Sequence, residues 1–395
     1  MDIIKKDSSS VVLRANKLLK TINKILKHYS TDLVDSSWID NFYKWADKYE
    51  IPDTIIPRDK AKLLELDALN LTNLNLDYIP PEIGKLKNLK GLYLGNNKLW
   101  TLPKEIGELE NLRGLYLGDN QLEYLPDSIG EIKNLKAFYL GGNNLIRLPD
   151  SIGKLINLES LNISRNELFK IPKSINNLTN LVGLHLGKNS LKEIDISNLT
   201  NLEALYLGEN RLTFVDISNL ELLEELYLNS NNLTSFPDIK NLKYIYKLSL
   251  WDNNIKSIPS DIKNLNYLEE LYLFSNVIEI IPPEIGELSS LVGLFLGSNK
   301  IKIVPKEIGN LKNLEELYLF GNNISELPET ICNLENLKKL DIYANKLTKL
   351  PDCIRNLANI KKFNIQENNI SLTLHQKAYF EELRQRGALI KGIEC

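Results

Sequence analysis

The chain has 395 residues, of which 43% are hydrophobic and 25% charged, and its formal net charge is -3. This balance is typical of a soluble globular protein and gives no general indication of nucleic acid or of a strongly acidic ligand as a partner. No apolar run approaches the roughly 20 residues of a membrane span, and the N-terminus lacks the apolar segment of a secretory signal. We therefore expect a cytoplasmic protein with no integral membrane segment.

Residues 1–63 are expected to form a helical N-terminal cap. The spacing of apolar residues predicts an amphipathic helix over 11–29, around which basic residues gather as a solvated face. A second helix is predicted over about 37–49. Its apolar side, which we expect to pack on the first repeat, carries Trp38, Phe42, Trp45 and Tyr49.

Residues 64–371 repeat one phrase, L-x-x-L-x-L-x-x-N-x-L, fourteen times. The repeats start at 66, 89, 112, 135, 158, 181, 202, 223, 245, 268, 291, 314, 337 and 360. Most are 23 residues long and continue as x-x-L-P-x-x-I-G-x-L-x-N, as in "LPKEIGELEN". Thirteen of the fourteen have asparagine in the fixed position, and the first has Leu74 instead.

The spacing of the leucines predicts the shape of the fold. In the core of the phrase the two leucines point to one side of a short strand, so they are buried only when units stack. The strands then form a parallel concave sheet, with adjacent strands about 4.8 Å apart and a total length on the order of 60 Å. The asparagine can satisfy backbone groups of neighbouring turns. We predict an α/β solenoid shaped as a horseshoe.

Two units, starting at 181 and 202, are 21 residues long and replace the Leu-Pro step with "IDISNLTN" and "VDISNLEL". Their return arcs must be shorter than the others. Residues 372–395 follow the last unit and contain "HQKAYFEELRQRG", for which we predict a short capping helix that ends at Gly387.

The repeat phrase "LPxxIGxLxNL" resembles that of intracellular leucine-rich repeat proteins: the Ras–Raf scaffold family, the plant Ras-group-related proteins and many bacterial proteins. This resemblance implies a concave face that binds another protein, and a small GTPase as partner is an analogy with the family alone. The sequence is also similar to the recognition part of bacterial effectors, some of which add a ubiquitin-ligase domain. Too few residues follow the last unit for such a domain.

The residue between the two strand leucines points outward and forms a column along the concave face. Its aromatic members are Tyr93, Tyr116, Tyr139, His185, Tyr206, Tyr227, Tyr272, Phe295 and Tyr318. Stacked tyrosines on a sheet contribute to stability, so the ladder of Tyr93, Tyr116, Tyr139 and His185 has a structural explanation as well as a possible role in binding.

The second outward column, two residues further on, carries more information about function. It is mostly glycine in the first half and then changes to Trp251, Phe274, Phe320 and Tyr343. Together with Tyr272, Phe295 and Tyr318 these residues predict a continuous exposed aromatic surface, which is typical of a binding site. Tyr206 and Tyr227 extend it. Acidic residues beside it, including Glu225, Glu270 and Glu316, favour a partner with lysine or arginine around an apolar anchor.

Nothing in the sequence indicates catalysis. There is no glycine-rich phosphate loop and no H-E-x-x-H motif, and the histidines are scattered. Cys332 and Cys353 lie one unit apart in the return arcs, where we expect buried thiols in a reducing compartment. We expect no cofactor and no metal. The leading interpretation is a monomeric, non-enzymatic protein-binding module, with a glycan-binding or adhesion protein and a bacterial effector that binds a host protein as alternatives.

Overall fold

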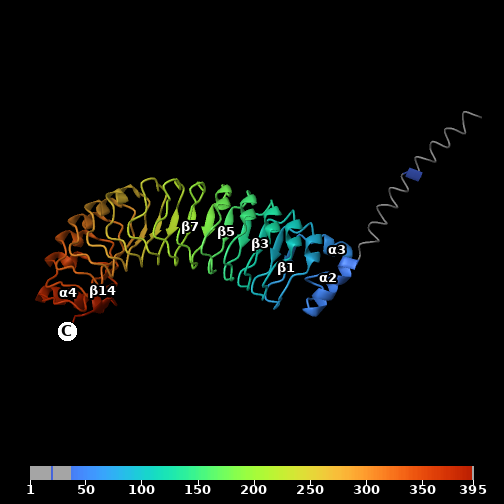
Figure 1. Cartoon of the computed structure of the whole chain (residues 1–395). Coiled ribbons are helices and arrows are strands. Elements are labelled where there is room, and N and C mark those ends of the chain that lie inside the picture. The colour runs from blue at the N-terminus through green and yellow to red at the C-terminus, as the bar shows by residue number, and fades with distance from the viewer. Residues whose placement is uncertain (1–18, 21–36, 394–395) are drawn as a thin grey trace, which may run out of the picture.

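The computed structural model describes residues 19–20 and 37–393, and its repeats form one curved solenoid (Figure 1). Fifteen strands lie in chain order in a single parallel sheet, each paired with its neighbours in the sequence. Helices α2 and α4 lie at opposite ends of the arc (Figure 1). The predicted horseshoe is confirmed. The helix expected over 11–29 lies outside the described residues, apart from 19–20.

Each strand is three residues long and has one inward residue between two outward ones, and in the repeats the third leucine position of the phrase follows it directly. Leu92 and Leu94, on either side of Tyr93, are completely buried. The strands are β1 (Ala68–Asn70), β2 (Gly91–Tyr93), β3 (Gly114–Tyr116), β4 (Ala137–Tyr139), β5 (Ser160–Asn162), β6 (Gly183–His185), β7 (Ala204–Tyr206), β8 (Glu225–Tyr227), β9 (Lys247–Ser249), β10 (Glu270–Tyr272), β11 (Gly293–Phe295), β12 (Glu316–Tyr318), β13 (Lys339–Asp341), β14 (Lys362–Asn364) and β15 (Leu389–Lys391).

Ten short 3-10 helices form the convex side of the described units. They are η1 (Pro81–Lys85), η2 (Lys104–Glu108), η3 (Asp127–Glu131), η4 (Asp150–Lys154), η5 (Lys173–Asn177), η6 (Ser260–Asn264), η7 (Pro283–Glu287), η8 (Lys306–Asn310), η9 (Glu329–Asn333) and η10 (Asp352–Asn356). Each follows a proline and buries an isoleucine, such as Ile106 in η2. The helices pack so closely that a Cβ on Gly107 would lie 2.3 Å from the carbonyl oxygen of Ser128.

Three consecutive return arcs, after β6, β7 and β8, contain no helix. Each turns instead at an aspartate whose carboxylate accepts the backbone N–H two residues on, at Asp195, Asp216 and Asp238. Such side-chain turns need fewer residues than a helical turn. The shorter arcs expected at 181 and 202 are therefore confirmed, and the 22-residue unit at 223 shares their conformation.

The repeated asparagine joins each coil to the one before it. The Nδ2 of Asn276 donates to the carbonyl oxygens of Leu250 (3.0 Å) and Leu273 (3.1 Å), and its Oδ1 accepts the N–H of Ile255 (3.0 Å). Its side chain is buried, and the same bonds recur from Asn97 to Asn368. The amide thus satisfies backbone groups that would otherwise be buried without a partner.

At the N-terminal end, helix α2 (Ser37–Lys48) covers the first unit as predicted. Phe42 and Trp45 are buried, and the Trp45 indole donates to the carbonyl oxygen of Tyr78 at 3.3 Å. A second short helix, α3 (Lys60–Leu64), leads into β1 and is capped by the carboxylate of Asp59. Large aromatic side chains on α2 therefore close the core at this end.

At the C-terminal end, helix α4 (Leu374–Gln385) closes the solenoid and Gly387 follows it in a left-handed conformation, as predicted. Thr373 and Gln376 form a capping box at its start. Phe380 is completely buried and stacks on Phe363 of β14. The chain then adds β15, which pairs with β14 and was not predicted.

Cys332 and Cys353 form a disulfide, so the prediction of two free thiols is wrong. The repeat places the second cysteine 21 residues after the first, in the neighbouring coil, where the two Cα atoms lie 5.9 Å apart. This separation is within the range that a disulfide spans. Disulfides are typical of oxidising environments, so the bond differs from the buried thiols that the sequence analysis expected.

We expect Asn276→Ala to destabilise the protein by roughly 2–3 kcal/mol, because it leaves the buried N–H of Ile255 without a partner and removes one of the two asparagine bonds at the carbonyl oxygens of Leu250 and Leu273. Urea unfolding followed by circular dichroism measures the loss. The control is Asn254→Ala, which changes the exposed asparagine immediately before Ile255. Equal unfolding midpoints for the two variants would contradict the role of the asparagine ladder.

The disulfide predicts the number of reactive thiols. Denatured protein that has not been reduced should show one thiol per chain, from Cys395, and reduced protein should show three. A colorimetric thiol assay in guanidinium chloride makes the measurement, with Cys332→Ser/Cys353→Ser as a control that gives one thiol in both conditions. Three thiols before reduction would show that the bond is absent.

Candidate concave binding surface

The outward column of the sheet forms stacked aromatic ladders. Pairing of β2 with β3 and of β3 with β4 sets Tyr93, Tyr116 and Tyr139 side by side, with ring centroids 4.7 and 5.2 Å apart. His185, Tyr206 and Tyr227 stack in the same way at 4.2 and 4.6 Å. The spacing of strands in a sheet is close to the preferred separation of stacked rings. The tyrosines thus stabilise the sheet and form its outer surface together.

The rings lean over small residues in the same strand. A Cβ added to Gly114 would lie 2.8 Å from the ring of Tyr116, and one added to Gly293 would lie 2.7 Å from the ring of Phe295. This contact explains why glycine stands two residues before an aromatic residue in these units. The rings do not cover the glycine column beyond them, where Gly95, Gly118 and Gly141 are half-buried.

In the second half of the sheet large rings occupy the glycine column. We call the following seven residues the aromatic patch: Trp251, Tyr272, Phe274, Phe295, Tyr318, Phe320 and Tyr343. Trp251 stacks on Phe274 at 5.0 Å. The ring of Phe320 lies over Gly297, so that a Cβ added to this glycine would be only 2.3 Å from the ring. Phe320 therefore covers the space that the missing side chain leaves.

The first outward column continues the same surface. Tyr272, Phe295 and Tyr318 stack at 4.4 and 5.3 Å, beside the second column. Every ring of the aromatic patch is half-buried rather than freely exposed. The structure therefore brings together all seven predicted residues, and their edges form a surface whose apolar area is smaller than the sequence implied.

The predicted acidic residues have partners within the molecule. Glu225 accepts hydrogen bonds from the hydroxyl groups of Tyr206 and Tyr246. Glu270 pairs with Lys247 at 2.6 Å and accepts the Tyr272 hydroxyl at 2.9 Å. Glu316 pairs with Lys339 at 2.7 Å. These three carboxylates therefore fix the orientation of neighbouring side chains, and the charges of Glu270 and Glu316 are balanced by the paired lysines.

The network shifts the pKa values of its members. Burial raises the pKa of the Glu225 carboxyl, but the bonds from Tyr206 and Tyr246 outweigh burial and leave the pKa below its usual value. The hydrogen bond to Glu225 raises the pKa of Tyr246 to about 12. Burial and the bond to Glu270 raise the pKa of Tyr272 to about 12. These groups keep a single charge state throughout the physiological range.

No group of three or more potential metal ligands occurs in the part of the chain that the structure describes. His185 stacks on Tyr206, and burial lowers the pKa of its imidazole, so it is neutral at pH 7. Its position in the ladder makes it an aromatic packing residue.

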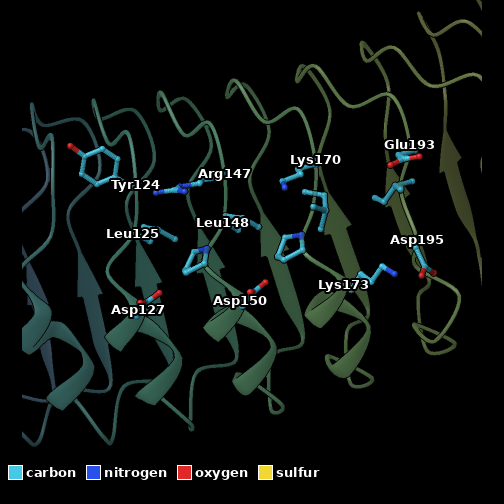
Figure 2. Close-up of a pocket in the computed structure, with 14 residues that line it drawn as sticks. Tyr124, Leu125, Asp127, Arg147, Leu148, Asp150, Lys170, Lys173, Glu193 and Asp195 are labelled. Carbon is cyan, nitrogen blue, oxygen red and sulfur yellow. The ribbon is translucent and has the colours of Figure 1, made fainter.

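A separate hollow lies beside the concave face and was not predicted. It has a volume of about 990 Å³ and runs across consecutive return arcs, between the strand ends and the helices (Figure 2). Leu125 and Leu148 form part of its floor, and charged side chains of both signs line it: Asp127, Arg147, Asp150, Lys170, Lys173, Glu193 and Asp195. In the sequence these residues occupy variable positions of the repeat, so no pattern marks them.

The comparisons with known proteins agree with this architecture. A family model described as "Leucine rich repeat" matches residues 65–122, and one described as "Leucine-rich repeat region" matches 127–233, 210–321 and 294–386. The chain belongs to the leucine-rich repeat family. None of the curated proteins compared with it matches it.

Solved structures extend the similarity. A leucine-rich repeat protein of Leptospira interrogans is 38% identical, with a TM-score of 0.79 over 85% of this chain and 86% of that one. The plant peptide hormone receptor RGFR1, solved in complex with RGF2, is 32% identical, with a TM-score of 0.66 over 78% of this chain and 56% of that one. An internalin of Listeria monocytogenes, 22% identical with a TM-score of 0.69 over 90% and 97%, shares the fold.

Glu225 gives the site a testable pH dependence. Because its folded pKa is depressed, its contribution to stability is present above the unfolded value of about 4.3 and is lost as the pH falls below that value. Glu225→Gln should therefore cost roughly 1–2 kcal/mol at pH 7, the difference between charged and neutral hydrogen bonds. The difference should shrink below about pH 4. Urea unfolding at several pH values measures it.

The matched control for this experiment is Glu224→Gln. Glu224 is the preceding residue, is exposed, and forms no ion pair among the described residues. Its replacement should leave the stability nearly unchanged at every pH. If both variants lose the same stability at pH 7, then net charge rather than the bonds to Tyr206 and Tyr246 explains the effect.

Proposed function

We propose that this leucine-rich repeat protein is a non-enzymatic recognition module that binds a partner protein through the aromatic patch. Leucine-rich repeat proteins are protein-interaction modules, and the similar structures include receptors and internalins. The family is typically without enzymatic activity. None of the described helices is long and apolar enough to cross a membrane.

The observation that carries the proposal is the exchange of glycine for large rings in the second column. Gly118 and Gly187 leave that column without a side chain in the first half of the sheet, whereas Trp251, Phe274 and Phe320 fill it in the second half. The other column already stabilises the sheet by stacking, so a second layer of rings is not needed for the fold. Aromatic residues of this kind are the usual anchors of protein interfaces.

The surface also suits a protein ligand in its size and rigidity. A ring removes about 150–250 Å² from water when it goes from fully exposed to buried, and these seven rings are already more than half buried. They can therefore supply the centre of a contact of roughly 800 Å² per partner, and the rim comes from other residues. The rings are held by stacking and by the Glu270 and Glu316 networks. Because they are already ordered, binding costs little side-chain entropy.

A glycan is the second candidate, and the first half of the sheet supports it. There Tyr93, Tyr116 and Tyr139 stack beside an open glycine column, which resembles a platform for flat sugar faces. The hydroxyl of Tyr139 and Ser160 lie 3.1 Å apart and offer polar groups beside the rings. A bacterial effector that binds a host protein would use the same aromatic patch.

The test is an affinity capture followed by binding measurements with purified partner. Trp251→Ala/Phe274→Ala/Phe320→Ala should lose the captured protein and weaken its affinity at least 100-fold. The control variant, Trp100→Ala/Phe169→Ala/Phe214→Ala, removes three aromatic side chains from exposed positions outside the concave face. It should bind like the wild type.

Both variants should remain folded, because loss of a stacked pair costs only about 0.5–1.5 kcal/mol beyond burial. Thermal melting checks this. Equal capture by the aromatic-patch variant and the wild type would overturn the proposal. Binding of the wild-type protein to a glycan array, together with its loss on replacement of Tyr93, Tyr116 and Tyr139 by alanine, would favour the glycan alternative.

A further inference from the structure

A second hydrogen-bond ladder runs along the side of the solenoid where the return arcs enter the strands. The residue just before the first leucine of a repeat donates to a backbone carbonyl of the preceding unit, as Asn157 does to Lys133 at 2.8 Å. Ten units share this bond, through Asn88, Asn111, Asn134, Asn157, Asn180, Asn201, Ser290, Asn313, Asn336 and Asn359.

Three consecutive units interrupt this ladder with large apolar residues. Leu222, Tyr244 and Tyr267 replace the asparagine, and their side chains are 40%, 50% and 60% exposed. The two tyrosine rings stack at 6.5 Å. These residues form neither the bond of the ladder nor part of the core. The exchange of a structural asparagine for an exposed apolar side chain, three times in succession, indicates a contact surface.

An acidic row lies directly beside the apolar one. Two positions further along the repeat, several other units pair opposite charges, as in Lys136–Glu159 at 2.6 Å and Lys338–Glu315 at 2.6 Å. In the middle of the molecule the same column reads Glu203, Glu224, Tyr246 and Glu269, and its three glutamates are exposed and form no ion pair with any described residue. Their charges are therefore available to a basic ligand.

We propose that this flank patch, made of Leu222, Tyr244, Tyr267, Glu203, Glu224 and Glu269, binds a basic amphipathic α-helix of a partner protein. Neighbouring units are about 4.8 Å apart at the sheet, and the two tyrosine rings on the flank lie 6.5 Å apart. The rise of an α-helix, about 5.4 Å per turn, lies between these two values. A helix that lies along the flank thus places one turn over each unit. The apolar face of this ligand helix then contacts Leu222, Tyr244 and Tyr267. Lysine or arginine residues on the adjacent face of the helix contact the glutamates.

The shape of the flank also suits this ligand. A hollow of about 380 Å³ begins beside Glu203 and Leu222 and runs along the preceding units past Val182, which is 37% exposed. It continues the line of the apolar row.

The probe is a fluorescent 21-residue peptide of leucine and lysine in a helical pattern, titrated with the full-length protein and followed by anisotropy. The variant Leu222→Asn/Tyr244→Asn/Tyr267→Asn restores the ladder residue of the other units and should weaken binding at least tenfold without loss of thermal stability. Glu203→Gln/Glu224→Gln/Glu269→Gln should do the same. A peptide of equal composition with alternating leucine and lysine should bind at least tenfold more weakly than the helical one.

Two control variants distinguish the flank patch from a general effect of charge and from the concave face. Glu123→Gln/Glu279→Gln/Glu326→Gln makes the same change of charge at exposed positions elsewhere on the repeats and should bind the probe like the wild type. The aromatic-patch variant should also bind it normally, so that the flank and the concave face are tested independently. Equal losses in the two glutamine variants, or full binding by the asparagine variant, would overturn the proposal.

Discussion

The repeated asparagine is the constraint on which the rest of the structure depends. Its amide must reach backbone groups of its own coil and of the one before, as Asn276 does at 3.0–3.1 Å. This requirement fixes both the distance and the register between coils. Equivalent residues of successive repeats consequently form straight columns on every face of the solenoid. The surface chemistry of this protein is therefore set by columns of side chains rather than by single residues.

Stacking of rings follows directly from this spacing. Aromatic residues in one column are held 4.2–5.3 Å apart without any further adjustment. A single ladder is thus a simple way to stabilise a sheet, and Tyr93 and Tyr116 require no ligand to explain them. A second column of rings is different, because Trp251 and Phe274 replace glycine and add apolar surface that the first ladder does not need.

The sequence predicted the fold well because the leucines and the asparagine repeat with one period. It predicted the inward and outward faces, the two capping helices and the shorter arcs at 181 and 202. It did not predict that the residue before the asparagine is left-handed. Glycine, the usual sign of this conformation, stands there only at Gly142 and Gly321, whereas other units have residues such as Asp119, Arg165 and Lys188. β15 has no repeat phrase, so periodicity could not find it.

The site was predicted less completely, for a related reason. Alternation places Glu225 and Glu270 on the concave face, but the partners that hold them come partly from neighbouring units: Tyr246 lies in another column, and Lys247 lies opposite Glu270 in the same column. Tyr246 and Lys247 reach these carboxylates only because adjacent strands have a particular register. The disulfide was missed in the same way. The sequence put the cysteines in adjacent arcs, yet only the stacking distance shows that their Cα atoms lie within reach of a bond.

The departures from the repeat are concentrated in one region, and this argues for a common cause. The arcs that turn at Asp216 and Asp238, without a helix, lead directly into the units that carry Leu222 and Tyr244 on the flank. Trp251, the first ring of the aromatic patch, follows in the same unit as Tyr244. A repeat that served only the fold would accumulate such changes independently along its length. Changes that meet on two adjoining faces of the same units fit a region specialised for contact with other molecules.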